Sequence, residues 1–276
     1  MFSLNCKGKF VSLEKPLVMG ILNITDNSFY ESSRLLNEKD IIDKATQMVE
    51  EGSDILDIGA QSTRPGSERI SAEKELEKLL PVIKKLLELF PDILLSIDTY
   101  HADVAAKSVM AGAHIINDIS GGEMDRNMIA TVGKLHVPYI CMHIKGVPET
   151  MQNNTGYENV CLEILDFFIK KVAQCKEAGI HDVIIDPGFG FGKNIEQNFL
   201  LLKNLNVFKM LEKPIMAGLS RKSTIYKTLG VTAEEALNGT TVLNTIALQN
   251  GANILRVHDV KEARETVELM KAYGNA

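Results

Sequence analysis

The chain has 276 residues, of which 45% are hydrophobic and 24% charged, and its formal net charge is -6. This length fits one large α/β domain of roughly 250 residues, and the acidic balance excludes the basic surface that nucleic acids or anionic membranes require. No run reaches the ~20 apolar residues of a membrane span and the first residues lack the apolar core of a secretory signal, so we expect a cytoplasmic protein with no membrane partner.

The first predicted element is a small β-hairpin over residues 1–13. Its sequence, MFSLNCKGKFVSL, alternates between apolar and polar residues on both sides of Lys7-Gly8. Such alternation around a Lys-Gly pair is typical of two short strands joined by a tight turn. We expect this hairpin to close the bottom of the barrel that the following elements predict.

Short β-rich runs then recur at a nearly regular spacing, separated by longer amphipathic stretches. This pattern is typical of repeated βα units, in which the strands form a parallel sheet. Eight such strands are expected, over residues 17–22, 54–58, 93–97, 114–117, 137–142, 182–186, 214–218 and 253–257. Helical periodicity lies between them, for example over residues 41–52, 72–90, 162–179 and 262–270.

Eight parallel strands with crossover helices close most economically into a (β/α)8 TIM barrel. The alternative, a doubly wound open sheet, usually has fewer strands and carries a nucleotide-binding fingerprint. The glycine-rich segment 188–193 does not match that fingerprint or a Walker A loop. No linker or repeat divides the chain, so we expect a single domain over residues 1–276.

Polar side chains stand where each predicted strand ends, which is where a TIM barrel builds its active site. In chain order they are Asn23, Gln61 to Gly66, Asp98, Asn117, His143 beside Met142, Asp186, Ser220 to Ser223, and Arg256 with His258. One such residue is more often a turn former or a helix cap than a ligand. Eight strand ends with the same property predict a binding site at this face.

The strand-end residues fall into two chemical groups. The first combines donors and acceptors suited to a planar heterocycle in a buried slot, with apolar walls from Met142 and Phe191; its polar members are Asp98, Asn117, Asp186 and Lys222. The second is a cationic and amide corner of Arg256, His258 and Asn23, suited to a phosphate or diphosphate. Its Asn23 could also bind Mg²⁺ that accompanies such an anion.

Short motifs stand at the ends of successive predicted strands. They are MGILNIT with SF, DIG with STRPG, SIDTY, INDISG, DPGFGFGK, GLSRKS and RVHDV. In these motifs, and in their order along nearly the whole chain, the sequence resembles the dihydropteroate synthase family, whose members make a folate precursor and are inhibited by sulfonamides.

The resemblance implies a single TIM barrel that condenses 6-hydroxymethyl-7,8-dihydropterin diphosphate with p-aminobenzoate, releasing diphosphate and 7,8-dihydropteroate. It implies Mg²⁺ as cofactor, bound through Asn23, and a homodimer. By analogy the pterin would be bound by Asp98, Asn117, Met142, Asp186, Gly188, Phe191 and Lys222, and the diphosphate by Asn23, Arg256 and His258. The p-aminobenzoate side would comprise Phe29, Thr63, Arg64, Pro65 and Ser223, and catalysis would depend on Lys222, Arg256, His258 and Asp98.

Two segments depart from the family pattern. Residues 25–33 lack the proline and paired glycines common in the family, and Ala60-Gln61 replaces a common Gly-Glu. The altered loop leaves open a non-catalytic pterin-binding paralogue as an alternative. A pterin-dependent methyltransferase module that works with a corrinoid protein is a second alternative, and a Schiff-base aldolase that uses Lys222 is a third.

Overall fold

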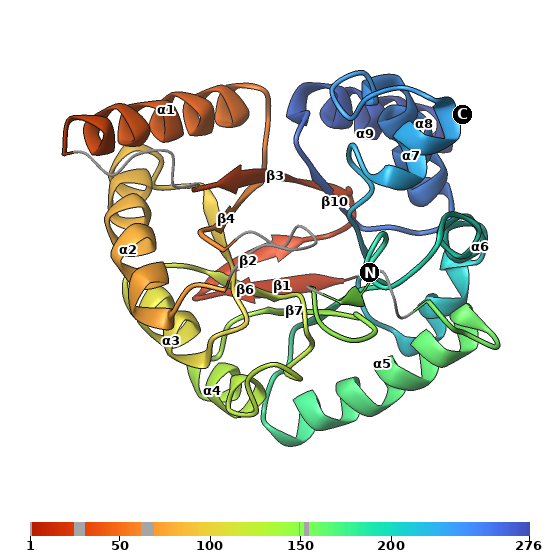
Figure 1. Ribbon diagram of the computed structural model, residues 1–276, viewed down its shortest axis with the longest axis horizontal. Helices are drawn as coiled ribbons and strands as arrows, with labels where there is room; N and C mark the ends of the chain where they lie inside the picture. The colour runs from red at the N-terminus through yellow and green to blue at the C-terminus, as the bar shows by residue number, and fades with distance from the viewer. Residues whose placement is uncertain (1, 25–30, 62–68, 149, 152–154) are drawn as a thin grey trace.

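Figure 1 shows the computed structural model, which describes residues 2–24, 31–61, 69–148, 150–151 and 155–276. Of residues 31–37 it describes the backbone alone. Parallel strands surround a central axis in the order β8-β7-β6-β5-β4-β3-β10-β9. Their bounds are β3 Leu17–Asn23, β4 Ile55–Gly59, β5 Leu94–Asp98, β6 Ile115–Asp118, β7 Tyr139–Met142, β8 Val183–Asp186, β9 Met216–Ala217 and β10 Ile254–Val257.

Two junctions close this sheet into the predicted TIM barrel. The last strand, β10, pairs with the first barrel strand, β3, in parallel register from Ile254 opposite Leu17. Between β8 and β9, Ile185 forms a parallel bridge with Ile215, and its N–H donates to the carbonyl of Pro214 at 2.9 Å. Because the carboxyl ends of all these strands point the same way, those predicted strand-end residues that the structure describes lie at one mouth of the barrel.

Helices cover the outside of the barrel, as the ring of coiled ribbons in Figure 1 shows. They bury the outward-facing apolar side chains of the strands, such as Val18, Leu56 and Ile116, in one continuous core. In chain order they are α1 Glu31–Glu50, α2 Ala72–Leu89, α3 Ala102–Met110, α4 Met128–Leu135, α5 Val160–Glu177, α6 Ile195–Lys203, the 3-10 helix η2 Leu205–Leu211, α7 Ser223–Leu229, α8 Leu237–Gln249 and α9 Val260–Gly274. No helix in the described part of the chain is long and apolar enough to cross a membrane.

The N-terminal hairpin lies where the sequence predicts it. Strands β1 (Ser3–Cys6) and β2 (Lys9–Ser12) pair in antiparallel register, and the turn between them places Lys7 and Gly8 at positive φ. Leu4 and Cys6 of this hairpin pack, together with Leu13, against apolar side chains inside the lower half of the barrel. The hairpin therefore seals the end opposite the strand-end residues.

Strand β9 is shorter than predicted, with two residues instead of five. Pro214 has no N–H to donate to a neighbouring strand, so only its carbonyl takes part in the sheet. The backbone N–H of Ile215 is instead satisfied by the side-chain oxygen of Asn253, at 3.0 Å. A second departure from a simple βα repeat is that two helices, α7 and α8, follow β9.

Buried His114 makes the stability of the barrel sensitive to acid. Its Nδ1 accepts the backbone N–H of Leu95 at 3.1 Å, and burial, followed by the charges of Lys9 and Lys7, lowers its pKa to about 4. An unfolded histidine has a pKa of about 6.5, so between pH 6.5 and 4 the unfolded state binds the proton and the native state does not. Native stability therefore falls as the pH falls through this window.

We expect His114→Gln to reduce that pH dependence. Urea unfolding at pH 7 and pH 5 should show a smaller loss of stability for the variant than for the unmodified chain, by at most about 2 kcal/mol. The pH 7 measurement removes any change in packing that does not depend on pH. If the free energies of unfolding of the two proteins differ by the same amount at pH 7 and at pH 5, the pKa of His114 is not lowered.

Candidate active site

The inward-facing side chains of the barrel change from apolar to polar along most of the strands. The lower layer contains Ile55, Leu94, Ile115, Ile140, Ile184, Met216 and Ile254. Side chains alternate across a strand, so residues two or four positions later face the same interior. At the upper end those positions are Asp57, Asp98, Asn117, Met142, Asp186, Gly218 and Arg256. One mouth of the barrel is thus a polar cup above an apolar floor.

The centre of this cup is an ion-pair network around Arg256. Its Nε donates to Oδ2 of Asp57 at 2.7 Å, and its Nη2 donates to Oδ2 of Asp98 at 2.6 Å. The same Asp57 oxygen accepts the side-chain N–H of Asn117 at 3.0 Å. The second oxygen of Asp57 is buried and has no hydrogen-bond partner among the described residues. Four strands, β4, β5, β6 and β10, contribute to this network.

Burial and charge act in opposite directions on these groups. Burial alone would lower the pKa of Arg256, but the charges of Asp57 and then Asp98 outweigh it and raise that pKa above its ordinary value. Burial raises the pKa of Asp98, and the Arg256 guanidinium opposes this rise. The guanidinium is therefore always charged, and its charge favours the ionised form of the acidic side chains buried beside it.

The structure joins two groups that the sequence analysis separates. Arg256, assigned there to a diphosphate corner, contacts Asp98, assigned to a heterocycle. Asp57 belongs to neither group because it lies inside its strand rather than at the end. Strand alternation could have identified Asp57 as a site residue. Asp57 pairs in register with Ser96, which lies two positions before Asp98, so all three side chains face the same interior.

A second part of the cup lies around Asp186 and Lys222. Asp186 accepts the backbone N–H of Gly188 at 2.8 Å. The Lys222 ammonium donates to the carbonyl of Phe189 and lies 4.6 Å from the centre of the Phe191 ring. Burial raises the pKa of Asp186 while Lys222 opposes it, and burial lowers the pKa of Lys222 to about 8 while Asp186 opposes it. The two charges stabilise each other across the cup.

Apolar side chains form one wall of the cup. Met142 is 3% exposed and belongs to a small cluster with Tyr100 and Ile119, against which Phe191 packs. The structure thus gathers at one mouth the seven residues that the resemblance assigns to a pterin, from Asp98 to Lys222. A flat ring with donor and acceptor edges would meet acceptors, donors and an apolar face here.

His258 lies at the exposed rim, next to Ser220. The Ser220 hydroxyl accepts the backbone N–H of His258 at 3.1 Å and lies 3.0 Å from Nδ1 of its ring. The protein atoms that desolvate the ring, and then the charge of Arg256, lower the pKa of His258 to about 4. The lowered pKa favours the uncharged ring, and Ser220 and Nδ1 share a hydrogen bond that either group can donate. The lowered pKa favours a neutral hydrogen-bonding group at this corner, where the sequence predicts a second cation.

Arg221 joins the two loops that carry Lys222 and His258. Its guanidinium donates twice to Asp259, from Nε and Nη2 and at 2.8 Å each, and its Nη1 donates to the carbonyls of Ala233 and Glu234. Its backbone has a positive φ of 53° and its N–H donates to the Thr240 hydroxyl at 3.0 Å. Sequence reasoning missed this clamp, because Arg221 and Asp259 are 38 positions apart in the chain and nothing in the sequence pairs them.

The structure describes two of the remaining candidate residues, Asn23 and Ser223, and leaves four outside its described part. Asn23 ends β3, pairs in register with Gly59, and is exposed at the mouth beside β10. Ser223 is half-buried at the start of α7, directly after Lys222. Phe29, Thr63, Arg64 and Pro65 lie outside the described residues. Among the residues that are described, no group of three or more His, Cys, Asp or Glu side chains is placed to hold a metal ion.

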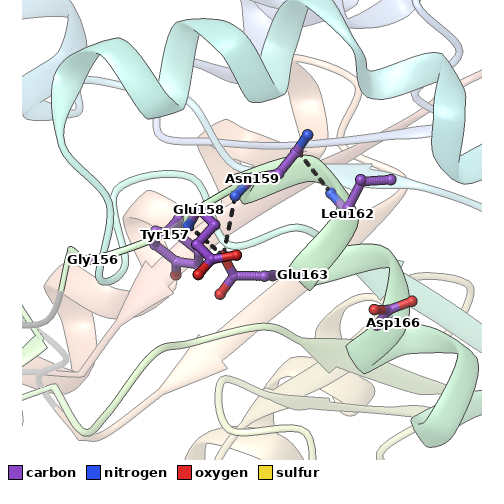
Figure 2. Close-up of a pocket in the computed structure, with 7 residues that line it drawn as sticks. All are labelled: Gly156, Tyr157, Glu158, Asn159, Leu162, Glu163 and Asp166. Atoms are coloured by element: carbon purple, nitrogen blue, oxygen red, sulfur yellow. Dashed lines mark hydrogen bonds between the residues drawn. The ribbon is translucent and has the colours of Figure 1, made fainter.

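Two hollows elsewhere on the molecule are poor candidates for the active site. One, of about 580 Å³, lies at the start of α5, where Asn159 accepts the N–H of Leu162 and the Glu163 carboxylate accepts the backbone N–H of Glu158 (Figure 2). The other, of about 520 Å³, lies beneath the hairpin between Lys9 and Phe90. Neither contains the buried, mutually paired charges of the barrel mouth.

Comparison with known proteins identifies similar chains along the full length. Residues 19–258 match the family model described as "Pterin binding enzyme". The chain is 38% identical over 268 residues to the dihydropteroate synthase of Escherichia coli strain K12, covering 96% of this chain and 94% of the relative.

Solved structures of dihydropteroate synthases have the same fold. One is the Yersinia pestis enzyme with a sulfonamide drug complex, at a TM-score of 0.93 and 37% identity with 100% of both chains covered. Another is the Xanthomonas albilineans enzyme in complex with 7,8-dihydropteroate, at a TM-score of 0.87 and 32% identity with 99% of both chains covered.

We expect the Arg221–Asp259 clamp to contribute measurably to stability. Asp259→Asn removes the charge but keeps the shape, and leaves a partly buried guanidinium with a weaker partner, so urea unfolding should show a loss of about 1–3 kcal/mol. Glu268→Gln is the matched control, since the ion pair of Glu268 with Lys15 is exposed and such pairs contribute little. An Asp259→Asn chain as stable as the unmodified one would refute the clamp.

Proposed function

The chain belongs to the pterin binding enzyme family and catalyses the dihydropteroate synthase reaction, and we propose that the polar cup of its barrel is where this reaction takes place. The observation that carries the reaction is the 38% identity to the Escherichia coli enzyme over 96% of the chain. The buried, paired charges at the barrel mouth supply a chemically suitable site. The paralogue, methyltransferase and aldolase alternatives have no comparable support.

The reaction joins a pterin to an arylamine. The bond between the methylene carbon of 6-hydroxymethyl-7,8-dihydropterin diphosphate and its diphosphate oxygen breaks, the p-aminobenzoate nitrogen bonds to that carbon, and the nitrogen loses a proton. Positive charge develops on the pterin methylene and negative charge on the leaving diphosphate. The main task of the protein is therefore to orient both substrates and stabilise these charges, with no protein nucleophile needed.

In our proposal the pterin lies in the cup between the ion-pair network and the Phe191 wall. The carboxylates of Asp98 and Asp186 accept its N–H groups, and the amide of Asn117 and the ammonium of Lys222 donate to its acceptors. The support is their convergence: each is buried or half-buried at the mouth and already engages a charged or backbone partner. The same carboxylates would stabilise the positive charge that develops on the ring.

The diphosphate would lie at the rim above Arg256. This placement is supported by the permanent charge of Arg256, the exposed position of His258 directly after β10, and Asn23 at the end of the neighbouring strand. The donor set fits a Mg²⁺ ion that arrives on the diphosphate, because Mg²⁺ commonly binds one or two protein oxygens together with substrate phosphates and water. Asn23 would hold such an ion, which would stabilise the leaving diphosphate.

The p-aminobenzoate would bind on the side where Lys222 and Ser223 begin α7. Its other expected neighbours, Phe29, Thr63, Arg64 and Pro65, lie outside the described residues. Because the similar Yersinia pestis enzyme was solved with a sulfonamide drug complex, we also propose that sulfonamides bind here.

That the chain forms a homodimer stays a prediction. The exposed apolar side chains on the helices include Leu200 of α6, Met210 of η2, Leu229 of α7 and Val242 of α8, and a dimer interface on the helices away from β3 and β4 is the expected arrangement. Sedimentation velocity at micromolar concentration tests it, and a monomer would contradict it.

Release of diphosphate tests the proposed function directly. The purified chain, given pterin diphosphate and Mg²⁺, should release diphosphate only when p-aminobenzoate is also present, because the arylamine is the acceptor. Chelation of Mg²⁺ should slow the release, and added Mg²⁺ should restore it. No release with both substrates would contradict the function, whereas release that chelation does not change would contradict only the role of the metal.

A further inference from the structure

A buried lysine, Lys193, has no part in the proposed mechanism. It lies behind the apolar wall of the cup that contains Met142 and Phe191. Lys193 is 3% exposed, and its ammonium has three partners: the carbonyl of Gly188 at 2.9 Å, the carbonyl of Phe191 at 3.0 Å and Nδ1 of His143 at 3.1 Å. None of them is a carboxylate. A buried ammonium is costly unless all of its hydrogens are bonded, so this arrangement requires an explanation.

The three partners account for the three N–H donors of the ammonium. Burial, and then the charge of Lys193, lowers the pKa of His143 to about 2, so its ring is neutral and Nδ1 can accept a hydrogen bond. Burial lowers the pKa of Lys193 to about 7, and the charge of Asp186 opposes this shift. Lys193 is thus fully satisfied by one ring nitrogen and two backbone carbonyls.

These contacts fix the two loops that form the wall. His143 follows β7, and Gly188 and Phe191 follow β8, so one ammonium ties both loops together. A side chain at Gly188 would meet the carbonyl of His143 at 2.0 Å, which shows how closely the loops approach. Asn198 holds the same segment from its other side, since it accepts the N–H of Gly190 at 2.7 Å and donates to the carbonyl of Lys193 at 3.2 Å.

The segment held in this way presents two groups to the cup. The N–H of Gly188 binds the Asp186 carboxylate, and the Phe191 ring lies beneath the Lys222 ammonium. Lys193 therefore acts on the pterin side of the site through the residues it holds. Burial raises the pKa of Asp186, and the charge of Lys193 opposes this rise. The opposing effects of Lys222, the Gly188 N–H and Arg256 are larger.

We infer that Lys193 is a positioning residue for the pterin diphosphate, acting through Gly188, Phe191 and Asp186 without touching the substrate. The inference rests on the proposed function and adds a selective role: the loss of Lys193 impairs the pterin side of the site and spares the p-aminobenzoate side. A residue that only stabilised the fold would affect both substrates alike.

The test is the Michaelis constant for each substrate in Lys193→Met. We expect the KM for pterin diphosphate to rise about tenfold or more and the KM for p-aminobenzoate to stay within about twofold. Lys171→Met is the control for the loss of a buried lysine, because Lys171 is also buried but pairs with the carboxylate of Glu123 instead of with the loops that Lys193 ties together. This control should leave both constants unchanged.

A pair of substitutions at His143 keeps the inference testable if Lys193→Met fails to fold. His143→Asn offers an amide oxygen near the position of Nδ1 and should preserve the KM for pterin diphosphate, whereas His143→Leu removes the acceptor and should raise it. An unchanged constant in both Lys193→Met and His143→Leu, or an equal rise for both substrates, would overturn the inference. A wild-type chain without diphosphate release would instead refute the function itself.

Discussion

The site depends on one constraint: two carboxylates buried in the barrel need a cation between them. Asp57 is fully buried and Asp98 is 7% exposed, on neighbouring strands that face the same interior. Arg256 reaches both because the barrel closes and brings β10 beside β3, whose other neighbour is β4. Without its charge, the two carboxylates would repel each other in a poorly solvated space. Closure of the barrel and assembly of the site are therefore linked.

The barrel separates stability from chemistry along its axis. The lower interior is filled by apolar side chains and sealed by the N-terminal hairpin, so it needs no polar partners. The upper interior gathers charges that are costly to bury, and each is satisfied by an opposite charge or by backbone groups. A site of this kind is well organised before substrates bind, which suits a reaction that depends on orientation and on stabilising charge.

Sequence reasoning recovered the parts of the molecule that depend on local periodicity. The strands, the hairpin and the polar strand ends follow from alternation and from the rule that parallel strands place their carboxyl ends together. It missed contacts set by the tertiary fold. Asp57 and Arg256 are 199 positions apart, and the clamp of Arg221 with Asp259 and the bond of Lys193 to His143 also join distant segments. The lowered pKa of His258 depends on desolvation by surrounding protein atoms and on the charge of Arg256, which the sequence does not display.

The most direct test of this account is a double-mutant cycle on the central network. Calorimetry would give the free energy of binding of pterin diphosphate for the unmodified chain, Asp57→Asn, Arg256→Gln and the double variant. If Asp57 acts by holding Arg256, the two losses should be non-additive, with a coupling energy above about 1 kcal/mol. Losses that add to within about 0.5 kcal/mol would show that the two residues act independently and would contradict the account.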